Sequence, residues 1–206
     1  MITFARNNGF TMVSKNTKTR KRLIEVAREL FAQNGKKNVT MNDIAEASKK
    51  GRRTLYTYFK SKEDIYKAVI DNELSLILDK LKLVSSEKTD PEEKLTKHIT
   101  THLDAVKEAV SRNGSLKADF FHDIYEVERT RRKIDVKEIE LISRILKEGV
   151  IKRVFKRVNI EMTAIIIFYA LKGLEVPYIR QGISAEFEKN KNTIVEFVFT
   201  GIRKTN

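Results

Sequence analysis

The sequence predicts an all-α fold, and three observations support this prediction. Turn-forming residues are scarce, with 2 Pro and 8 Gly among 206 residues, whereas a β-sandwich or barrel needs many turns. Lys and Glu, which favour helices, are abundant. Apolar residues recur at helical spacing, as in the i, i+1, i+4, i+7, i+8 pattern that begins at Leu23.

Composition narrows the class of protein. The length allows one domain, or one domain with a small appendage, and 41% hydrophobic residues are enough for a buried core. The absence of Cys excludes disulfide scaffolds, thiol catalysis and Cys-ligated zinc. Met1–Val13 lacks the apolar core of a secretory signal, and the longest apolar run, Met162–Leu171, is shorter than the ~20 residues that span a bilayer. We therefore expect a cytoplasmic protein.

Positive charge is concentrated in the first third of the chain. Residues 1–62 hold 15 basic and 4 acidic residues, a charge of +11, whereas residues 63–206 hold 26 and 24, a charge of +2. This asymmetry favours a head that binds a polyanion, attached to a nearly neutral body. The alternative is a generally basic protein with a mobile N-terminal arm.

The head reads as three helices. Residues 1–17 lack apolar periodicity, and we expect them to form a flexible arm. The first helix is predicted to run from Lys18 to Asn34. Gly35 follows it and suits a left-handed C-cap. Thr40, with Asp43 three residues later, caps a short second helix. After a break at 48–51, a third helix covers 52–59. Two short helices joined by a tight turn and packed on a first helix form a helix-turn-helix unit.

The spacing of the third helix favours binding to DNA. Leu55 and Phe59 lie at i, i+4 and would face inward, so the outer side would carry Arg52, Arg53, Tyr56 and Thr57. A helix of this kind enters the major groove with its N-terminal residues near the base edges. Thr40 can present its hydroxyl and backbone N–H to a phosphate, and Lys62 can contact a phosphate from the next helix.

The head also resembles a known family. Its sequence is similar, from Arg20 to about Val69, to the DNA-binding domain of TetR-family transcriptional regulators. The most specific segment is TLYTYFKSKE at residues 54–63; FAQNG at 31–35, VT at 39–40 and IA at 44–45 also match. The resemblance implies an all-helical homodimer, with an N-terminal three-helix DNA-binding domain and a C-terminal helical domain for ligand binding and dimerisation. We accordingly expect domains at 18–62 and 63–206.

Residue roles follow from this resemblance. The positions expected to approach bases are Arg52, Arg53, Thr54 and Thr57; those expected to hold phosphates are Thr40, Tyr56, Tyr58 and Lys62, and Asn42 suits either. Tyr56 and Tyr58 have a second interpretation as packed aromatics, and the basic run at 18–22 is either a DNA-contacting arm or a charged helix start. One departure concerns the turn, because Lys49, Lys50 and Gly51 stand where the family usually has Gly-Val-Ser.

The body gives weaker indications of a ligand pocket. Large binding cavities are mostly apolar with a few polar groups, and the candidate lining residues are His102, Phe120, Phe121, Tyr125, Phe168 and Tyr169. The five aromatic residues have an equally good interpretation as core residues, whereas His102 is a candidate hydrogen-bond partner for the ligand. His98 and His102 stand at metal-ligand spacing and His122 follows, but no HExxH motif or Cys accompanies them. We expect no metal and no cofactor.

Two body helices are strongly apolar. The helix at 162–174 is apolar nearly all round, which predicts full burial. The last helix has a broad apolar face, and the resemblance implies that it lies in an intersubunit four-helix bundle. The expected interface residues are Phe187, Ile194, Val195, Val198, Phe199 and Ile202. The alternative is that this face packs only within its own chain.

Together these observations favour a transcriptional regulator that responds to a ligand. The resemblance implies a repressor that binds a palindromic double-stranded operator as a homodimer and is released by an unidentified small molecule, with no membrane partner. The alternative is a non-specific architectural DNA-binding protein, supported by the basic head. An enzyme is not expected, because the sequence has no Gly-rich phosphate loop or nucleophile motif.

Overall fold

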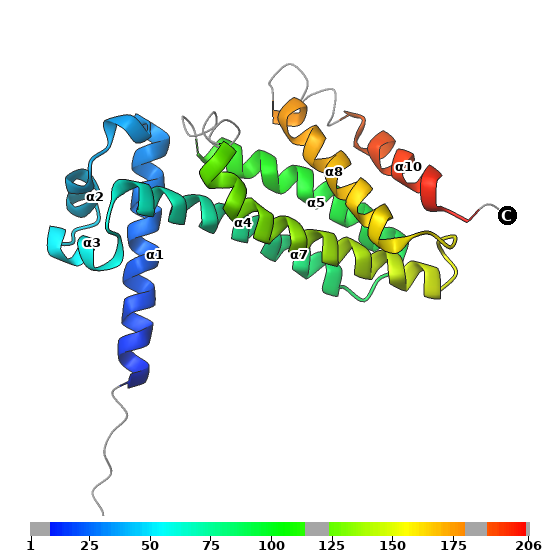
Figure 1. Ribbon diagram of the computed structural model, residues 1–206, viewed down its shortest axis with the longest axis horizontal. Helices are drawn as coiled ribbons and strands as arrows, with labels where there is room; N and C mark the ends of the chain where they lie inside the picture. The colour runs from blue at the N-terminus through cyan, green and yellow to red at the C-terminus, as the bar shows by residue number, and fades with distance from the viewer. Residues whose placement is uncertain (1–8, 114–123, 180–188, 205–206) are drawn as a thin grey trace, which may run out of the picture. The chain divides into compact units, whose positions relative to one another are not determined.

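The computed structural model describes residues 9–113, 124–179 and 189–204 (Figure 1). Within these ranges the chain forms helices and no strand, apart from an isolated antiparallel bridge between Phe155 and Arg203. The α-helices are α1 (Gly9–Asn34), α2 (Met41–Ala47), α3 (Arg52–Tyr58), α4 (Lys62–Ser86), α5 (Pro91–Arg112), α7 (Ile124–Ile151), α8 (Ile160–Ile179) and α10 (Lys191–Ile202), with a 3₁₀ turn, η1, at Lys36–Asn38. The predicted all-α fold is confirmed.

The chain divides into two compact units, each with its own core. The first runs to Ile70 and the second begins at Asp71, so the division falls inside α4 rather than at residue 62. The first unit contains α1, α2 and α3 and the start of α4, which is the helix-turn-helix arrangement that the sequence predicts.

The core of the first unit is built from the predicted apolar stripes. Leu23, Ala27 and Phe31 of α1 are buried, as are Ile44 of α2 and Leu55 of α3. The ring of Phe31 meets the ring of Tyr66 of α4 edge-on, with centroids 6.0 Å apart. Such aromatic pairs add ~1 kcal/mol beyond the area that they bury.

Helix α1 starts earlier than predicted. It begins at Gly9 instead of Lys18, so residues 9–17, expected in a flexible arm, are helical. The expected start was wrong because it was located by apolar periodicity, which reports the burial of a helix face. A helix can continue beyond the last residue that faces a core.

Two sharp turns in the first unit have positive backbone φ. Gly35 follows α1 at φ 77° and ψ 145°, a region almost confined to glycine. Lys49 follows α2 at φ 54°. The N–H of Lys49 donates to Glu46 O and that of Lys50 to Ala45 O, which forms a Schellman motif with lysine at the left-handed position. Gly is the usual residue there, because a side chain at positive φ costs roughly 1–2 kcal/mol.

The second unit is a bundle in which α5, α7 and α8 pack against one another and α10 packs on α5 (Figure 1). Its largest apolar cluster includes Ile99 of α5, Ile142 of α7, Phe168 of α8 and Phe199 of α10. Phe155, in the connection after α7, is also buried there and leaves room only for glycine at Gly149.

Helix α8 is only half covered. Ala164, Ile167, Phe168 and Leu171 are buried, but Met162, Ile166 and Tyr169 are 54%, 61% and 59% exposed. The expectation that this helix is fully buried is therefore wrong for this chain alone. Periodicity could not identify the covered side, because α8 is apolar on both.

No helix in the described ranges is long and apolar enough to span a membrane.

Candidate nucleic-acid interface

The N-terminus of α2 is closed by a capping box. The backbone N–H of Asp43 donates to Thr40 Oγ1 at 3.2 Å, and the N–H of Thr40 donates to Asp43 Oδ2 at 2.8 Å. The hydrogen bond from the Thr40 N–H lowers the pKa of the Asp43 carboxyl, which stays charged. The Thr40 N–H is thus already used, contrary to the expectation that it would meet a phosphate, whereas the Thr40 hydroxyl proton and the exposed Asn42 are available.

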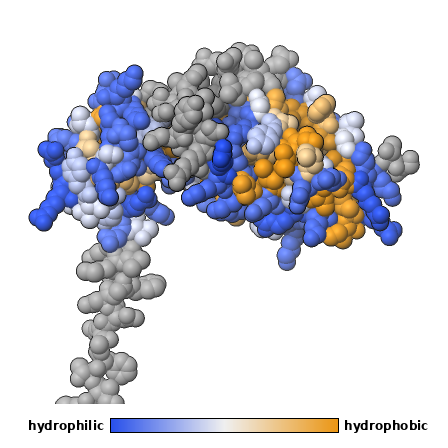
Figure 2. All heavy atoms as spheres, viewed as in Figure 1, coloured by the Kyte–Doolittle hydropathy of each residue, from blue (hydrophilic) through white to orange (hydrophobic). Residues whose placement is uncertain are grey.

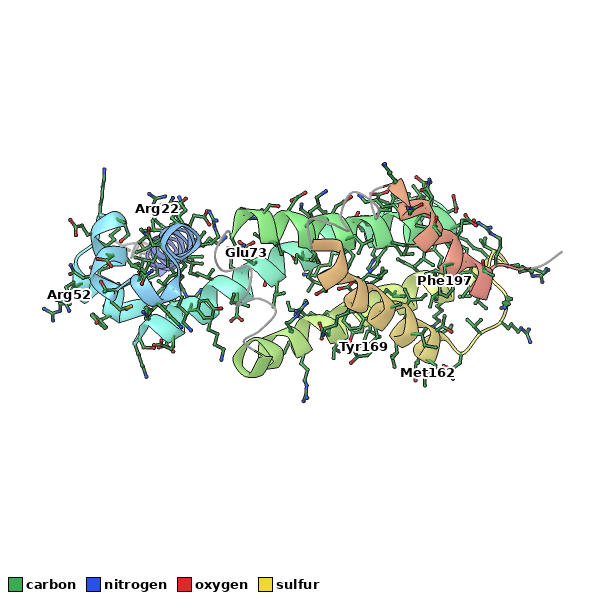
Figure 3. All side chains as sticks on the ribbon, turned by 90° about the horizontal axis from the view of Figure 1, so that it is seen from above. Arg22, Arg52, Glu73, Met162, Tyr169 and Phe197 are labelled. Atoms are coloured by element: carbon green, nitrogen blue, oxygen red, sulfur yellow. The ribbon has the colours of Figure 1, made fainter. Side chains whose placement is uncertain are left out.

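The first turn of α3 displays two arginines. Leu55 is fully buried and Phe59, the C-cap, is 3% exposed, so these residues fix the rotation of α3. Arg52 and Arg53 are then exposed, and Figure 3 shows Arg52 at the edge of the first unit. No described carboxylate pairs with either guanidinium. Two unpaired arginines at a helix start suit contacts with guanine edges or phosphates.

The other outward positions of α3 differ in their hydrogen bonds. Tyr56 is 45% exposed. Thr57 is exposed and its Oγ1 donates to Arg53 O at 2.9 Å, so it presents a methyl group and an acceptor. Thr54 is half-buried. The structure therefore brings Arg52, Arg53, Tyr56 and Thr57 to one accessible face, with Thr54 at its edge.

The side chains of Tyr58 and Lys62 donate hydrogen bonds to other residues of the first unit. The hydroxyl of Tyr58 donates to Oδ1 of Asn16 at 2.7 Å. The ammonium of Lys62, in the first turn of α4, donates to Lys36 O at 2.9 Å and more weakly to Lys37 O at 3.4 Å. An ammonium has three donors, so one N–H of Lys62 remains for another acceptor.

The surface charge of the first unit is strongly positive. The exposed basic residues of the described part are Lys18, Arg20, Lys21, Arg22, Lys37, Lys49, Lys50, Arg52, Arg53, Lys60 and Lys67. The nearest acid on α1, Glu25, pairs with the buried Arg28 at 2.7 Å. Glu29, the other described acid of α1, also lies 3.8 Å from Arg28, so both acids of this helix pair with a buried cation. A surface of this kind attracts a phosphate backbone.

The body contains a buried polar network around His102. Its Nδ1 lies 2.7 Å from Glu138 Oε1 and its Nε2 lies 3.4 Å from Glu175 Oε1. His98 Nε2 lies 3.3 Å from the same Glu138 oxygen, and Arg131 pairs with Glu175. The network joins α5, α7 and α8. His102 is thus hydrogen-bonded to Glu138 through Nδ1 and lies within ion-pair distance of Glu175 through Nε2.

These neighbours set the charge of the network. Burial lowers the pKa of His102, but the Glu138 and Glu175 carboxylates outweigh it and raise the pKa to about 10. Burial raises the pKa of Glu138, but His102 and then His98 hold it well below its ordinary value. An imidazolium between two carboxylates is the result.

The network combines residues that sequence reasoning missed. Glu138 stands at helical spacing from Ile142 and Ile145 on the buried face of α7, and Glu175 stands one turn after Leu171 on α8. The sequence did contain a signal for this network. It places ionisable residues of opposite charge on the apolar faces of different helices. Among the described residues, no group of three or more His, Cys, Asp or Glu could hold a metal ion.

The aromatic candidates for the pocket do not form one group in the described structure. Phe168 is buried and Tyr169, beside it, is mostly exposed. Phe120 and Phe121 lie outside the described residues, as does the side chain of Tyr125.

The structure corrects the expected subunit interface on α10. Val195, Phe199 and Ile202 are buried in the core of their own chain, and Ile194 and Val198 pack against that core. Phe187 lies outside the described residues. The exposed aromatic residue of α10 is Phe197, at 79%. Periodicity thus identified the apolar face, and its buried residues pack within their own chain, which was the alternative to the interface that the resemblance implies.

An exposed apolar surface is nevertheless present on the second unit. We call Met162, Ile166, Tyr169 and Phe197 the apolar patch. The first three form one stripe along α8, and hydrophobic side chains gather over this region in Figure 2. Figure 3 shows Met162 and Tyr169 on α8 and Phe197 on α10. Large exposed apolar patches usually mark interaction sites.

Comparison with known proteins agrees with this geometry. Residues 23–69 match the bacterial regulatory proteins of the tetR family. An uncharacterised HTH-type transcriptional regulator of Mycobacterium tuberculosis is 32% identical over 87 residues, which cover 42% of this chain and 43% of the relative. The chain thus matches less than half the length of that relative.

Solved structures share the fold over nearly the whole chain. A TetR/AcrR-family regulator from Thermobifida fusca has a TM-score of 0.73 and 24% identity, covering 91% of this chain and all of the other. The regulator FadR from Bacillus subtilis, solved in complex with stearoyl-CoA, has a TM-score of 0.68 and 20% identity, covering 89% and 99% of the two chains. The predicted combination of an N-terminal helix-turn-helix domain and a C-terminal helical domain is confirmed.

Proposed function

We propose that this chain, whose residues 23–69 match the tetR family of bacterial regulatory proteins, is a sequence-specific DNA-binding regulator controlled by a small molecule. The observation that carries this proposal is the outer face of α3. Leu55 and Phe59 anchor the helix, and Arg52, Arg53, Tyr56 and Thr57 face outward in a unit with many exposed cations.

Each residue of this face has a role that fits its geometry. Arg52 and Arg53 read guanine edges, because a guanidinium can donate to O6 and N7 together. The methyl group of Thr57 contacts a thymine methyl. Tyr56, Thr40 and Asn42 donate to phosphates, with the remaining N–H of Lys62 as a further donor. Thr54 and Tyr58 support this face from its edge and through Asn16.

The protein acts as a homodimer through the apolar patch. A helix that is apolar on both sides and covered on one requires a partner. Gly173 and Gly201, one turn beyond Tyr169 and Phe197, are exposed, and a Cβ at either would meet nothing within 4 Å. They allow a second subunit to approach closely. A two-fold dimer presents two copies of α3 to a palindromic operator.

Release from DNA follows binding of a small molecule to the body. The similarity in fold to a regulator solved with stearoyl-CoA supports a ligand-binding role for this domain. The ligand binds more tightly to the conformer in which the two DNA-binding domains of the dimer are wrongly spaced for DNA. Ligand binding therefore lowers the population of the DNA-binding conformer, and the protein acts as a repressor that the ligand releases.

The test is a selection of bound sequences from random duplex DNA with the purified protein at near-physiological salt. We expect an enriched palindrome. Arg52→Ala or Arg53→Ala should cost ~1–3 kcal/mol in binding free energy and relax one position of the motif. Lys133→Ala, which removes an exposed lysine of α7, should leave the motif unchanged. Tight but unselective binding would instead establish a non-specific architectural protein.

A further inference from the structure

The second unit carries a cleft that lies apart from the buried network and from the apolar patch. It is bounded by the C-terminal part of α4 and the middle of α7, and its volume is about 480 Å³. Leu78 of α4 and Leu141 of α7, which are both buried, contribute apolar lining. Small-molecule sites in proteins typically have volumes of roughly 300–1,000 Å³.

The rim of the cleft is positively charged. Lys137 and Arg144 stand two turns apart on the same side of α7, and Lys82 lines the cleft from α4. Lys82 Nζ is paired with Asp79 at 2.7 Å, but no described group pairs with Lys137 or Arg144. Glu140 is the acidic residue of the lining. Two cations therefore remain without a described counter-ion beside an apolar surface.

The cleft also offers a neutral hydrogen-bond donor. The Ser85 hydroxyl lines it and makes no described hydrogen bond, whereas the neighbouring Ser86 hydroxyl donates to Leu83 O at 2.8 Å. Free cationic donors and a hydroxyl near an apolar surface match a molecule with one anionic end and one hydrocarbon end.

We propose that the cleft between α4 and α7 binds an amphiphilic organic anion, with the carboxylate or phosphate on Lys137 and Arg144 and the hydrocarbon part along Leu78 and Leu141. The proposal rests on the proposed function in one respect, namely that the bound anion regulates DNA binding. Helix α4 begins in the first unit at Lys62 and forms a wall of the cleft from Leu78 onward. An occupant that contacts α4 and α7 together stabilises one arrangement of these two helices.

The first experiment measures binding without DNA. Decanoate and decyl phosphate, below their micelle-forming concentrations, are titrated into the full-length protein by isothermal calorimetry, with 1-decanol and inorganic phosphate as comparison ligands. We expect saturable binding of at least one amphiphilic anion and at least tenfold weaker binding of decanol and of phosphate alone.

Variants then locate the site. Lys137→Gln combined with Arg144→Gln should weaken binding of the anion by roughly tenfold or more. Lys147→Gln is the matched control, because Lys147 is an exposed cation of α7 outside the lining. All of these positions are exposed, so the fold should persist, as circular dichroism can verify. Charge reversal by Arg144→Glu provides a second, stronger perturbation of the same site.

Several results would overturn the proposal. Equal affinity in wild type and the double variant would place the site elsewhere. Equal affinity for decanol would remove the requirement for an anion, and equal affinity for inorganic phosphate would remove the requirement for a hydrocarbon part. Capture by anionic phospholipid vesicles without binding of free decanoate or decyl phosphate would make the cleft a membrane contact. Because this assay contains no DNA, its failure is distinguishable from failure of the proposed DNA-binding function.

Discussion

The hydroxyl of Tyr58 donates a hydrogen bond to Oδ1 of Asn16 at 2.7 Å and thereby ties the end of α3 to the N-terminal part of α1. The Arg20 guanidinium lies 5.2 Å from the centre of the Phe59 ring at the same end of α3. The extension of α1 upstream of Lys18 therefore bears on the recognition helix, although no apolar stripe marks it in the sequence.

The two tyrosines of α3 should respond differently to loss of the hydroxyl. Tyr56→Phe should weaken binding to the selected duplex by ~0.5–1.5 kcal/mol, because its exposed hydroxyl is free to meet a phosphate. Tyr58→Phe should lower the free energy of unfolding by a similar amount, as should Asn16→Ala, because each breaks the bond between α1 and α3. Fluorescence anisotropy with labelled duplex and urea unfolding separate the two effects. If the Tyr58→Phe variant has normal stability but binds DNA weakly, the Tyr58 hydroxyl contacts a phosphate and this prediction is wrong.

A glycine at position 49 should stabilise the turn between α2 and α3. Lys49→Gly relieves the cost of a side chain at φ 54° and should stabilise the first unit by ~0.5–1 kcal/mol after the entropy of glycine in the unfolded chain is counted. Lys50→Gly is the matched control, since it removes the same charge at a residue without positive φ and should be neutral or destabilising. Chemical denaturation measures both. Equal effects of the two variants would show that charge, and not backbone strain, controls this turn.

The head was largely predictable from sequence because its determinants are local. The capping pair Thr40 and Asp43, and the spacing of Leu55 and Phe59, each lie within one or two helical turns. The extra turns of α1 and the bonds of Tyr58 and Lys62 were not predictable. Asn16 is 42 residues from Tyr58 in the sequence, so no local pattern pairs them. Lys62 bonds to backbone carbonyls, which every residue type has, so the sequence does not identify its partners.

The body was less predictable because its determinants are distant in sequence. His102, Glu138 and Glu175 come from three helices, and nothing in the residue order pairs them. Helix α8 shows the other limit, because a sequence that is apolar on both sides does not state which side faces its own chain. The interface role of Phe199 came from the family resemblance, and the structure buries Phe199 in the core of its own chain.

Replacement of His102 should destabilise the body. His102→Leu leaves Glu138 and Glu175 buried beside a neutral group and should cost ~3–5 kcal/mol of unfolding free energy. Combining it with Glu138→Gln should recover part of the loss, because the buried carboxylate is then removed. Thermal unfolding of both variants tests this. A loss below that of His98→Leu, which breaks a single longer contact, would contradict the role of His102 as the central cation.

The same network predicts a pH dependence. The pKa of His102 is about 10 in the folded state against an ordinary 6.5, so its contribution is complete below pH 6.5 and is lost as pH rises through 10. The pKa values of Glu138 and Glu175 are lowered, so their contributions are present above their ordinary pKa of 4.5 and are lost as pH falls. His98 and Arg131 are the other ionisable groups that contact this network. The stability difference between wild type and His102→Leu should therefore shrink from pH 7 to 10, as measured by urea unfolding at each pH.

The apolar patch should control the oligomeric state. Ile166→Glu places a charge in the centre of the proposed interface and should convert dimer to monomer, since burial of an unpaired carboxylate is strongly unfavourable. Val136→Glu is the control, because Val136 is an exposed apolar residue of α7 outside the patch. Sedimentation velocity gives the oligomeric state, and DNA affinity should fall with dissociation. A dimeric Ile166→Glu protein would move the interface away from α8.

The close approach of Gly149 and Phe155 gives the sharpest steric prediction. A Cβ at Gly149 would lie 2.1 Å from Phe155 Cδ2, whereas Phe155 is held in the core and against the ring of Phe199, 6.1 Å away. Neither side can move easily, so Gly149→Ala should destabilise the second unit by about 1–3 kcal/mol or more despite the higher helix propensity of Ala. Gly149→Ala with Phe155→Leu should be more stable than Gly149→Ala alone, since the smaller side chain makes room for the Cβ. Calorimetric unfolding measures both, and an unchanged melting temperature in the single variant would show that α7 and Phe155 separate at little cost.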